Sequence, residues 1–283
     1  FEWNFDRCYP KPDCIFKVDM PETSFFRSIL PPGFAESIIH ASAHVEAGTV
    51  FCPFVGEVYL TITEADGKRT GYKQEANLVS PGFFDVFGLE VTEGERDAYF
   101  LPLTDWQVGA VYKDLPANTQ LGNNILAPML ASLLETFGNS NFICYLRLDD
   151  PSHASSVADE FNRAFDFSRY PYLSPIHLTP LPEVYFSDAE TEGHVFKLGS
   201  RMQTYLLILI AVLIVFVGMF NFTNFYISLM PSRLRGINTR KILGAEVWML
   251  RLEQVLEVGC FVGLSSLLAV ALSLPVSEWF AAS

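Results

Sequence analysis

One uncharged apolar segment constrains this chain more than any other feature. Residues 205–230 are 26 consecutive residues without Asp, Glu, Lys or Arg, and Leu, Ile, Val and Phe dominate them. As a helix this segment is about 39 Å long, which exceeds the ~30 Å hydrocarbon core of a bilayer. Buried helices of soluble proteins seldom run so far without a polar face. We therefore expect a transmembrane helix here.

A second apolar run occupies residues 258–274 and ends at Pro275. It reaches a membrane-spanning length if it begins near Gln254, so we expect a second transmembrane helix over 254–275 and a short extracytoplasmic tail over 276–283. Gly259 and Gly263 form a small-xxx-small pair in this helix, which allows another helix to approach closely. The alternative is that these glycines are incidental in an apolar run.

The segment between the two apolar runs, residues 231–253, is basic. It carries five cations, Arg233, Arg235, Arg240, Lys241 and Arg251, and only Glu246 opposes them before position 252. Short loops rich in Lys and Arg remain on the cytoplasmic side of a membrane. A basic loop that only meets anionic lipid headgroups would have the same topology. Both interpretations place the long N-terminal part outside the cytoplasm.

That N-terminal part is strongly acidic. Residues 1–204 contain 14 Lys and Arg against 28 Asp and Glu, a net charge of −14. Nucleic-acid binding requires a basic surface, so we expect no nucleic-acid partner. The chain begins at Phe1 and lacks a signal-peptide pattern. We therefore expect a fragment, with an upstream membrane helix that carries the acidic domain across the bilayer.

The acidic domain has an α+β pattern, and the predicted class is an α+β extracytoplasmic domain followed by two transmembrane α-helices. An Asp-Gly turn between two β-prone runs predicts a hairpin of 57–63 and 69–75. Apolar spacing predicts helices over 34–45 and 152–165, the second capped by Ser152 or Ser155. Further strands are expected at 107–113, 141–148 and 176–180, and the last two enclose a helix as in a split β-α-β unit.

Few residues point to chemistry. The chain has no P-loop, H-E-x-x-H, C-x-x-C or G-x-S-x-G motif. His40 and His44 have the spacing of a metal-binding helix pair, but no third ligand is apparent, so we favour a solvated helix face. His153 is one of the scattered histidines, and the acidic pair at 149–150 is expected to be solvated surface. We predict no catalytic residue, cofactor or metal. Cys8 and Cys14 are spaced so that a small disulfide loop could form.

Several stretches together resemble the FtsX-like permease family of ABC transporters with a MacB-like periplasmic core domain. The opening FDRCYPKPDCIFKV, VSPGFFDVFGLEVTEG (79–94) and VYKDLPANTQLGNNIL (111–126) are similar to parts of such core domains. TRKILGAE (239–246) resembles the family's cytoplasmic Arg-Lys-x-x-Gly-Ala pattern, and Glu257 matches a glutamate at the head of the next helix. The chain departs from the family in a shortened segment between Gly94 and Trp106, in Gly236 where a glutamate is usual, and in lacking a first and a fourth membrane helix.

The resemblance implies a permease subunit rather than an enzyme, with ATP hydrolysis supplied by a separate cytoplasmic ATPase. It implies a core domain over 1–193, a stalk and transmembrane helix over 194–230, and a coupling loop over 231–253. A short amphipathic helix in that loop would rest on the ATPase, with Ile242, Leu243, Val247 and Leu250 on one face. The expected coupling residues are Arg233, Arg235, Arg240, Lys241, Leu243, Gly244 and Ala245. A helix that lies only on lipid is the alternative.

Other implied partners are a second permease copy or homologue, the membrane, and a periplasmic adaptor, and the implied location is the bacterial inner membrane. The stalk helix is expected to begin near residues 194–197, below the acidic domain. An alternative function is a membrane-anchored extracytoplasmic sensor or binding module, or a structural subunit of an envelope assembly. A sensor would need a cytoplasmic output domain, which residues 1–283 do not provide.

Overall fold

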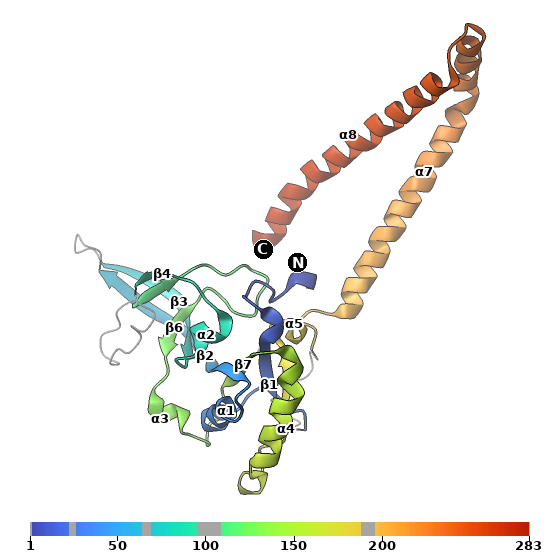
Figure 1. The fold of residues 1–283 in the computed structure, drawn as a ribbon. Helices are drawn as coiled ribbons and strands as arrows, with labels where there is room; N and C mark the ends of the chain where they lie inside the picture. The colour runs from blue at the N-terminus through green and yellow to red at the C-terminus, as the bar shows by residue number, and fades with distance from the viewer. Residues whose placement is uncertain (1, 23–26, 64–68, 95–108, 188–195, 283) are drawn as a thin grey trace. The chain divides into compact units, whose positions relative to one another are not determined.

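The computed structural model describes residues 2–22, 27–63, 69–94, 109–187 and 196–282, shown in Figure 1. These residues divide into two compact units, Phe1–Leu206 and Leu207–Ser283. The first unit is a mixed sheet with helices, and the second consists of long apolar helices. The predicted α+β class is confirmed.

The first unit is built on a six-stranded sheet with strand order β6-β3-β2-β7-β1-β8. Neighbouring strands are antiparallel except for the parallel pair β3 and β6. Its strands are β1 (Ile15–Asp19), β2 (Val45–Thr63), β3 (Arg69–Val79), β6 (Ile125–Pro128), β7 (Ile143–Leu148) and β8 (His177–Pro180). A small second sheet pairs β4 (Val91–Gly94) with β5 (Ala110–Tyr112).

Helices cover both faces of the large sheet. Strand β7 contributes Cys144, Leu146 and Leu148 to one apolar core and Ile143 and Tyr145 to the other. Successive strand residues point to opposite faces, so a central strand with two covered faces is apolar almost throughout. The first core also contains residues of α1 (Pro32–Ile39) and α4 (Ala154–Ala164), and the second contains residues of α2 (Phe83–Phe87) and α5 (Leu181–Val184).

Short helical segments complete the unit. They are η1 (Glu2–Asn4), η2 (Pro12–Cys14), α3 (Ala131–Leu134), η3 (Pro151–His153) and η4 (Phe167–Arg169). The side chain of Asp150 caps η3 by accepting a hydrogen bond from the Ser152 backbone N–H. The expected serine cap is wrong, because α4 has His153 at its N-cap with no side-chain cap hydrogen bond, and the capping side chain is that of Asp150 on η3.

Two supersecondary predictions are confirmed. Strands β2 and β3 pair as a hairpin in which Thr63 lies opposite Arg69, although the turn at 64–68 lies outside the described residues. Strands β7 and β8 both pair antiparallel with β1 between them, and α4 connects them along the chain. This is the predicted split β-α-β unit.

Three local predictions need correction. The helix expected over 34–45 ends at Ile39, and Val45 begins β2, because pairing with β7 takes the backbone of this segment into the sheet. In the second predicted helix Val157, Ala158 and Phe161 are buried, whereas Ala164 is exposed. Cys8 is exposed and Cys14 is buried at the end of η2, and both are free thiols rather than a disulfide.

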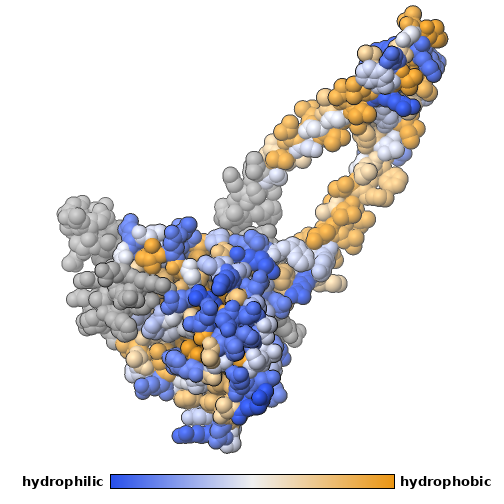
Figure 2. Space-filling model, viewed as in Figure 1, coloured by the Kyte–Doolittle hydropathy of each residue, from blue (hydrophilic) through white to orange (hydrophobic). Residues whose placement is uncertain are grey.

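The second unit is formed by α7 (Arg201–Ile242) and α8 (Val247–Ala282). Within them, Arg201–Pro231 and Val247–Ser273 are long and apolar enough to cross a membrane. On the face drawn in Figure 2 apolar side chains line both helices, and hydrophilic ones gather near the turn that joins them.

The boundaries of these helices differ from expectation. Helix α7 begins at Arg201, not at 194–197, and residues 196–200 are not helical. Beyond the first apolar run, α7 continues through Pro231 to Ile242, and α8 starts at Val247. The expected loop over 231–253 is therefore mostly helix. Helix α8 also passes Pro275 and includes most of the expected tail.

Candidate functional site: the tip of the helical hairpin

Residues 231–253, here called the hairpin tip, contain the end of α7, a tight turn and the start of α8. The turn is a Schellman motif centred on Gly244. The Ala245 N–H donates to the Arg240 carbonyl at 3.0 Å, and the Gly244 N–H donates to the Lys241 carbonyl at 3.1 Å. Gly244 has φ +91, a left-handed conformation that costs other residues free energy. The Gly-Ala pair found in the sequence is thus the signal that ends α7.

Two ion pairs join α7 to α8 near the turn. Arg233 donates two hydrogen bonds to the Glu257 carboxylate, at 2.6 and 2.7 Å. Arg240 donates one to Glu253 at 2.6 Å. The two arginines lie seven residues apart, about 10 Å along the helix axis. The two ion pairs therefore fix how the end of α7 and the start of α8 align along their lengths.

Three other cations of the hairpin tip have no ion pair among the described residues. Arg235 and Lys241 are exposed on the last turns of α7, and Arg251 is exposed on the first turns of α8. Glu246 accepts a hydrogen bond from the Trp248 indole N–H. The described part of the tip therefore presents unneutralised positive charge.

Apolar side chains are also exposed at the turn. Ile242 and Leu243 are 84% and 81% exposed, and Val247, Trp248 and Met249 are exposed beside them in the chain. Leu250 is half-buried. Such a group of large apolar residues in contact with water is unfavourable unless another surface covers it. The arrangement fits a contact surface better than a solvated turn.

The amphipathic helix expected in this loop does not form as one element. Ile242 ends α7, Leu243 lies in the turn, and Val247 and Leu250 belong to α8. The physical reason is the Schellman turn, which breaks the helix at Gly244 inside the proposed amphipathic segment. The residues predicted for coupling lie along the last turns of α7 and in the turn that follows it, and their role stays a prediction: Arg233, Arg235, Arg240, Lys241, Leu243, Gly244 and Ala245.

Comparison with known families gives this unit an assignment. The family "FtsX-like permease C-terminal" matches residues 208–283, which include the hairpin tip and both apolar spans. The match is confined to this segment, which is similar to that family. The resemblance inferred from the motifs is therefore confirmed for the C-terminal unit.

Two solved structures are similar to part of the chain. One is a domain of a predicted permease protein of Porphyromonas gingivalis, with 24% identity, a TM-score of 0.44, and coverage of 61% of this chain and 92% of that one. The other is the extracellular domain of the noncanonic ABC-type transporter YknZ from Gram-positive bacteria, with 12% identity, a TM-score of 0.35, and coverage of 58% and 99%. Both scores are low, so neither likeness supports an argument about function. No curated protein matches the chain.

The FtsX-like segment also carries the glycines predicted for helix packing. An added Cβ at Gly259 or Gly263 would meet no atom within 4 Å. Both glycines therefore border open space on α8. That space is compatible with a neighbouring helix, and their role in packing stays a prediction.

The residues just before the FtsX-like segment are bound to the first unit. Lys197 exchanges hydrogen bonds with the Gln120 side chain, and its ammonium group donates to the Thr119 carbonyl at 2.9 Å. The Gly199 N–H donates to the Tyr185 carbonyl at 2.7 Å, and a Cβ at this glycine would lie 2.1 Å from the Tyr185 ring. These contacts explain why the expected stalk helix does not begin at 194–197.

Proposed function

We propose that this protein is the permease subunit of an ABC transporter and that its hairpin tip docks on a cytoplasmic ATPase. The observation that carries the proposal is the exposure of Ile242 and Leu243 at the turn of an FtsX-like permease segment. Side chains of this size that insert into a groove hold a complex together. In this proposal the partner supplies ATP hydrolysis, and residues 1–283 contain no P-loop.

The positive charge of the hairpin tip indicates that the partner surface is acidic. Arg235, Lys241 and Arg251 surround the apolar turn and have no ion pair among the described residues. Positive charge at the rim of an interface steers association with an acidic partner surface and contributes less to holding it. Arg233 and Arg240 have a different role in this proposal, because their ion pairs keep α7 and α8 in register beneath the turn.

Helix α7 is the element that would pass motion from the tip to the acidic domain. It is continuous over 42 residues, about 63 Å of helix, and it begins at Arg201 directly after the residues bound to the first unit. In the proposal the acidic domain lies outside the inner membrane. ATP-driven movement of the tip then displaces that domain, for export or for mechanical work on an envelope partner such as a periplasmic adaptor. A second permease copy or homologue completes the transporter.

Photocrosslinking in cells tests the docking. A photoreactive amino acid at position 243 of the full-length protein should crosslink to a nucleotide-binding subunit. The same amino acid at Tyr59, an exposed residue of the acidic domain, should not. Crosslinks from position 243 to lipid alone would favour the lipid-lying alternative. Capture of a kinase there would favour the sensor.

A further inference from the structure

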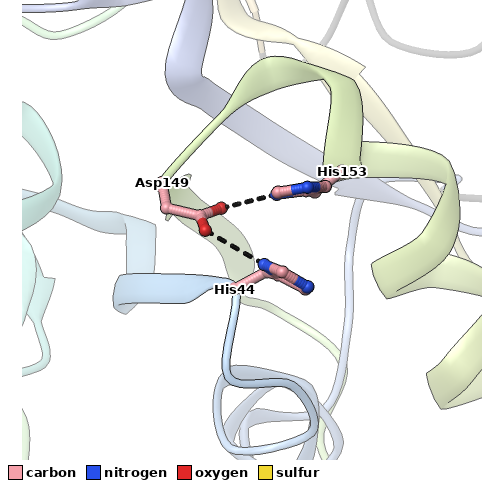
Figure 3. A group of neighbouring side chains, drawn as sticks. All are labelled: His44, Asp149 and His153. Atoms are coloured by element: carbon pink, nitrogen blue, oxygen red, sulfur yellow. Dashed lines mark hydrogen bonds and ion pairs between the residues drawn. The ribbon is translucent and has the colours of Figure 1, made fainter.

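A second group of side chains, in the acidic domain, is brought together by the sheet. His44 lies just before β2, Asp149 directly follows β7, and His153 is the last residue of η3. The Asp149 N–H donates to the His44 carbonyl at 3.1 Å, which extends the pairing of β2 with β7 by one step. The three side chains come together where β2 begins and β7 ends, as Figure 3 shows. None of them belongs to the FtsX-like segment.

The geometry of the group is compact. Each Asp149 oxygen contacts one imidazole: Oδ2 lies 3.0 Å from His44 Nδ1, and Oδ1 lies 2.9 Å from His153 Nδ1. The two rings have centroids 3.9 Å apart. One nitrogen or oxygen from each residue lies within 4.8 Å of the others. All three side chains are about 40% exposed, so a solute can reach them.

The sequence pattern pointed to a different pair. Because α1 ends at Ile39, His40 and His44 do not share a helix face, and His40 instead contacts Glu36 at 3.2 Å. The acidic pair at 149–150 was expected to be solvated surface, and His153 was one of the scattered histidines. Asp149 does stay about 40% exposed, but it also contacts both His44 and His153. Helical spacing singled out His40 and His44, whereas the pairing of β2 with β7 is what brings His44 next to Asp149.

The ligand chemistry of this group is that of a transition-metal site. Two imidazoles and one carboxylate suit Zn²⁺ and similar ions, whereas Mg²⁺ and Ca²⁺ prefer oxygen ligands alone. In tetrahedral coordination with bonds of about 2.0–2.2 Å, ligand atoms lie about 3.4 Å apart. The N–O separations of 2.9 and 3.0 Å would need to widen by only a few tenths of an ångström.

We propose that His44, Asp149 and His153 bind one divalent transition-metal ion, Zn²⁺ or an ion of similar preference, at the edge of the acidic domain. The ion binds His44 Nδ1, His153 Nδ1 and an Asp149 oxygen, while each imidazole carries a proton on Nε2 and any proton on Nδ1 leaves to water. A water molecule fills the remaining coordination position. Because the ligands come from three segments, the ion ties the start of β2 and the end of β7 to η3 and thereby to α4. Binding therefore stabilises the domain against unfolding.

The test is Zn²⁺ binding to the full-length protein in detergent, measured by competition with a chromogenic chelator. The parent should bind one Zn²⁺ in this domain, and Mg²⁺ should not compete. His44→Ala and His153→Ala should each weaken binding at least about tenfold, since even outer-shell changes cost that much. His40→Ala and His177→Ala remove exposed histidines outside the group and should leave binding unchanged.

Copper replacement gives a second measurement, which counts the imidazole ligands directly. The electron paramagnetic resonance spectrum of the Cu²⁺-loaded parent should show superhyperfine splitting from two imidazole nitrogens, and His153→Ala should reduce it to one. Zn²⁺ should also raise the unfolding temperature of the parent but not of the double variant His44→Ala/His153→Ala. Equal Zn²⁺ affinity in the parent and the double variant, or a Cu²⁺ spectrum unchanged by His153→Ala, would overturn the proposal. The group would then be a hydrogen-bonded cluster only.

Discussion

Arg233 of α7 and Glu257 of α8 form a two-pronged ion pair, with Nη1 2.6 Å from Oε2 and Nη2 2.7 Å from Oε1. Glu257 lies within the second candidate membrane span. A planar guanidinium and a carboxylate match each other in this geometry, and the pairing is stronger than a single contact. The pair therefore fixes the register of the two helices below the turn.

Exchanging these two charges tests the pair. Arg233→Glu alone places two carboxylates against each other and should lower the thermal unfolding midpoint of the full-length protein in detergent. The double variant Arg233→Glu/Glu257→Arg should recover most of the loss. Arg235 has no ion pair among the described residues, so Glu257→Arg should not rescue Arg235→Glu. Additive effects of the two changes at 233 and 257 would mean that the residues do not interact.

The turn at Gly244 gives a second prediction. Gly244→Ala meets no atom within 4 Å, so its cost comes from the left-handed backbone alone, about 1–2 kcal/mol. Gly236→Ala is the matched control, because Gly236 lies inside α7 with equally open space and alanine favours a helix there by up to about 1 kcal/mol. The unfolding midpoint should fall for the first variant and stay or rise for the second. Similar shifts in both would argue against the Schellman turn.

Asp6 gives the acidic domain a pH-dependent stability. It is fully buried, accepts hydrogen bonds from Thr119 and the Gln120 N–H, and its Oδ2 has no partner among the described residues. Burial raises the pKa of Asp6 to about 6. The folded state therefore keeps the Asp6 proton up to about pH 6, whereas the unfolded state loses it near pH 4. The free energy of unfolding consequently falls by about 3 kcal/mol as the pH rises from about 4 to 6.

Asp6→Asn should remove this contribution, since asparagine keeps the acceptor oxygen and tolerates the left-handed backbone at this position. Unfolding of the full-length protein by urea at pH 4 and pH 7 measures the difference. The parent should lose more stability than Asp6→Asn over this range. Asp159→Asn, at an exposed position on α4, is the control and should follow the parent. Equal losses in parent and Asp6→Asn would contradict the assignment.

A larger side chain at position 263 tests whether another helix packs against Gly259 and Gly263. Gly263→Leu fills the open space on α8 and should reduce crosslinking between copies of the intact permease. Ser265→Leu adds bulk on another side of α8, where the serine hydroxyl bonds only to Phe261 of the same helix, and should preserve crosslinking. If Gly263→Leu assembles as the parent does, the glycines are incidental.

Local patterns predicted those elements that bury an apolar face in a regular way. The two apolar runs, the β2-β3 hairpin and the β7-α4-β8 unit were all visible as periodicity or turn residues. Strand β1 was missed because its Lys17 reads as a surface residue. Its ammonium group is in fact wholly buried, 2.9 Å from Asp19 and 2.7 Å from Ser28. A buried charge with such partners cannot be recognised before the strands are paired.

The candidate sites likewise consist of residues that a local sequence pattern identifies and residues that only the fold brings into contact. The residues predicted for coupling could be named because they are contiguous in the chain and resemble a known family pattern, and their role in coupling stays a prediction. The ion pair between Arg233 and Glu257 spans 24 residues, and the contact between His44 and Asp149 spans 105. No periodicity links residues at such separations. The helix boundary at Ile242 was missed too, since Pro231 and Gly236 lower helix propensity in a segment that α7 nevertheless includes.

ATPase stimulation by the full-length permease, reconstituted with its cytoplasmic ATPase, tests the central claim most directly. Leu243→Asp places a charge on the apolar turn, Leu243→Asn removes the apolar side chain without adding charge, and Asn238→Asp adds the same charge at an exposed polar position of α7. At equal membrane insertion, we predict that Leu243→Asp abolishes stimulation, that Leu243→Asn weakens it, and that Asn238→Asp changes it little. Full stimulation by Leu243→Asp would contradict docking through the hairpin tip.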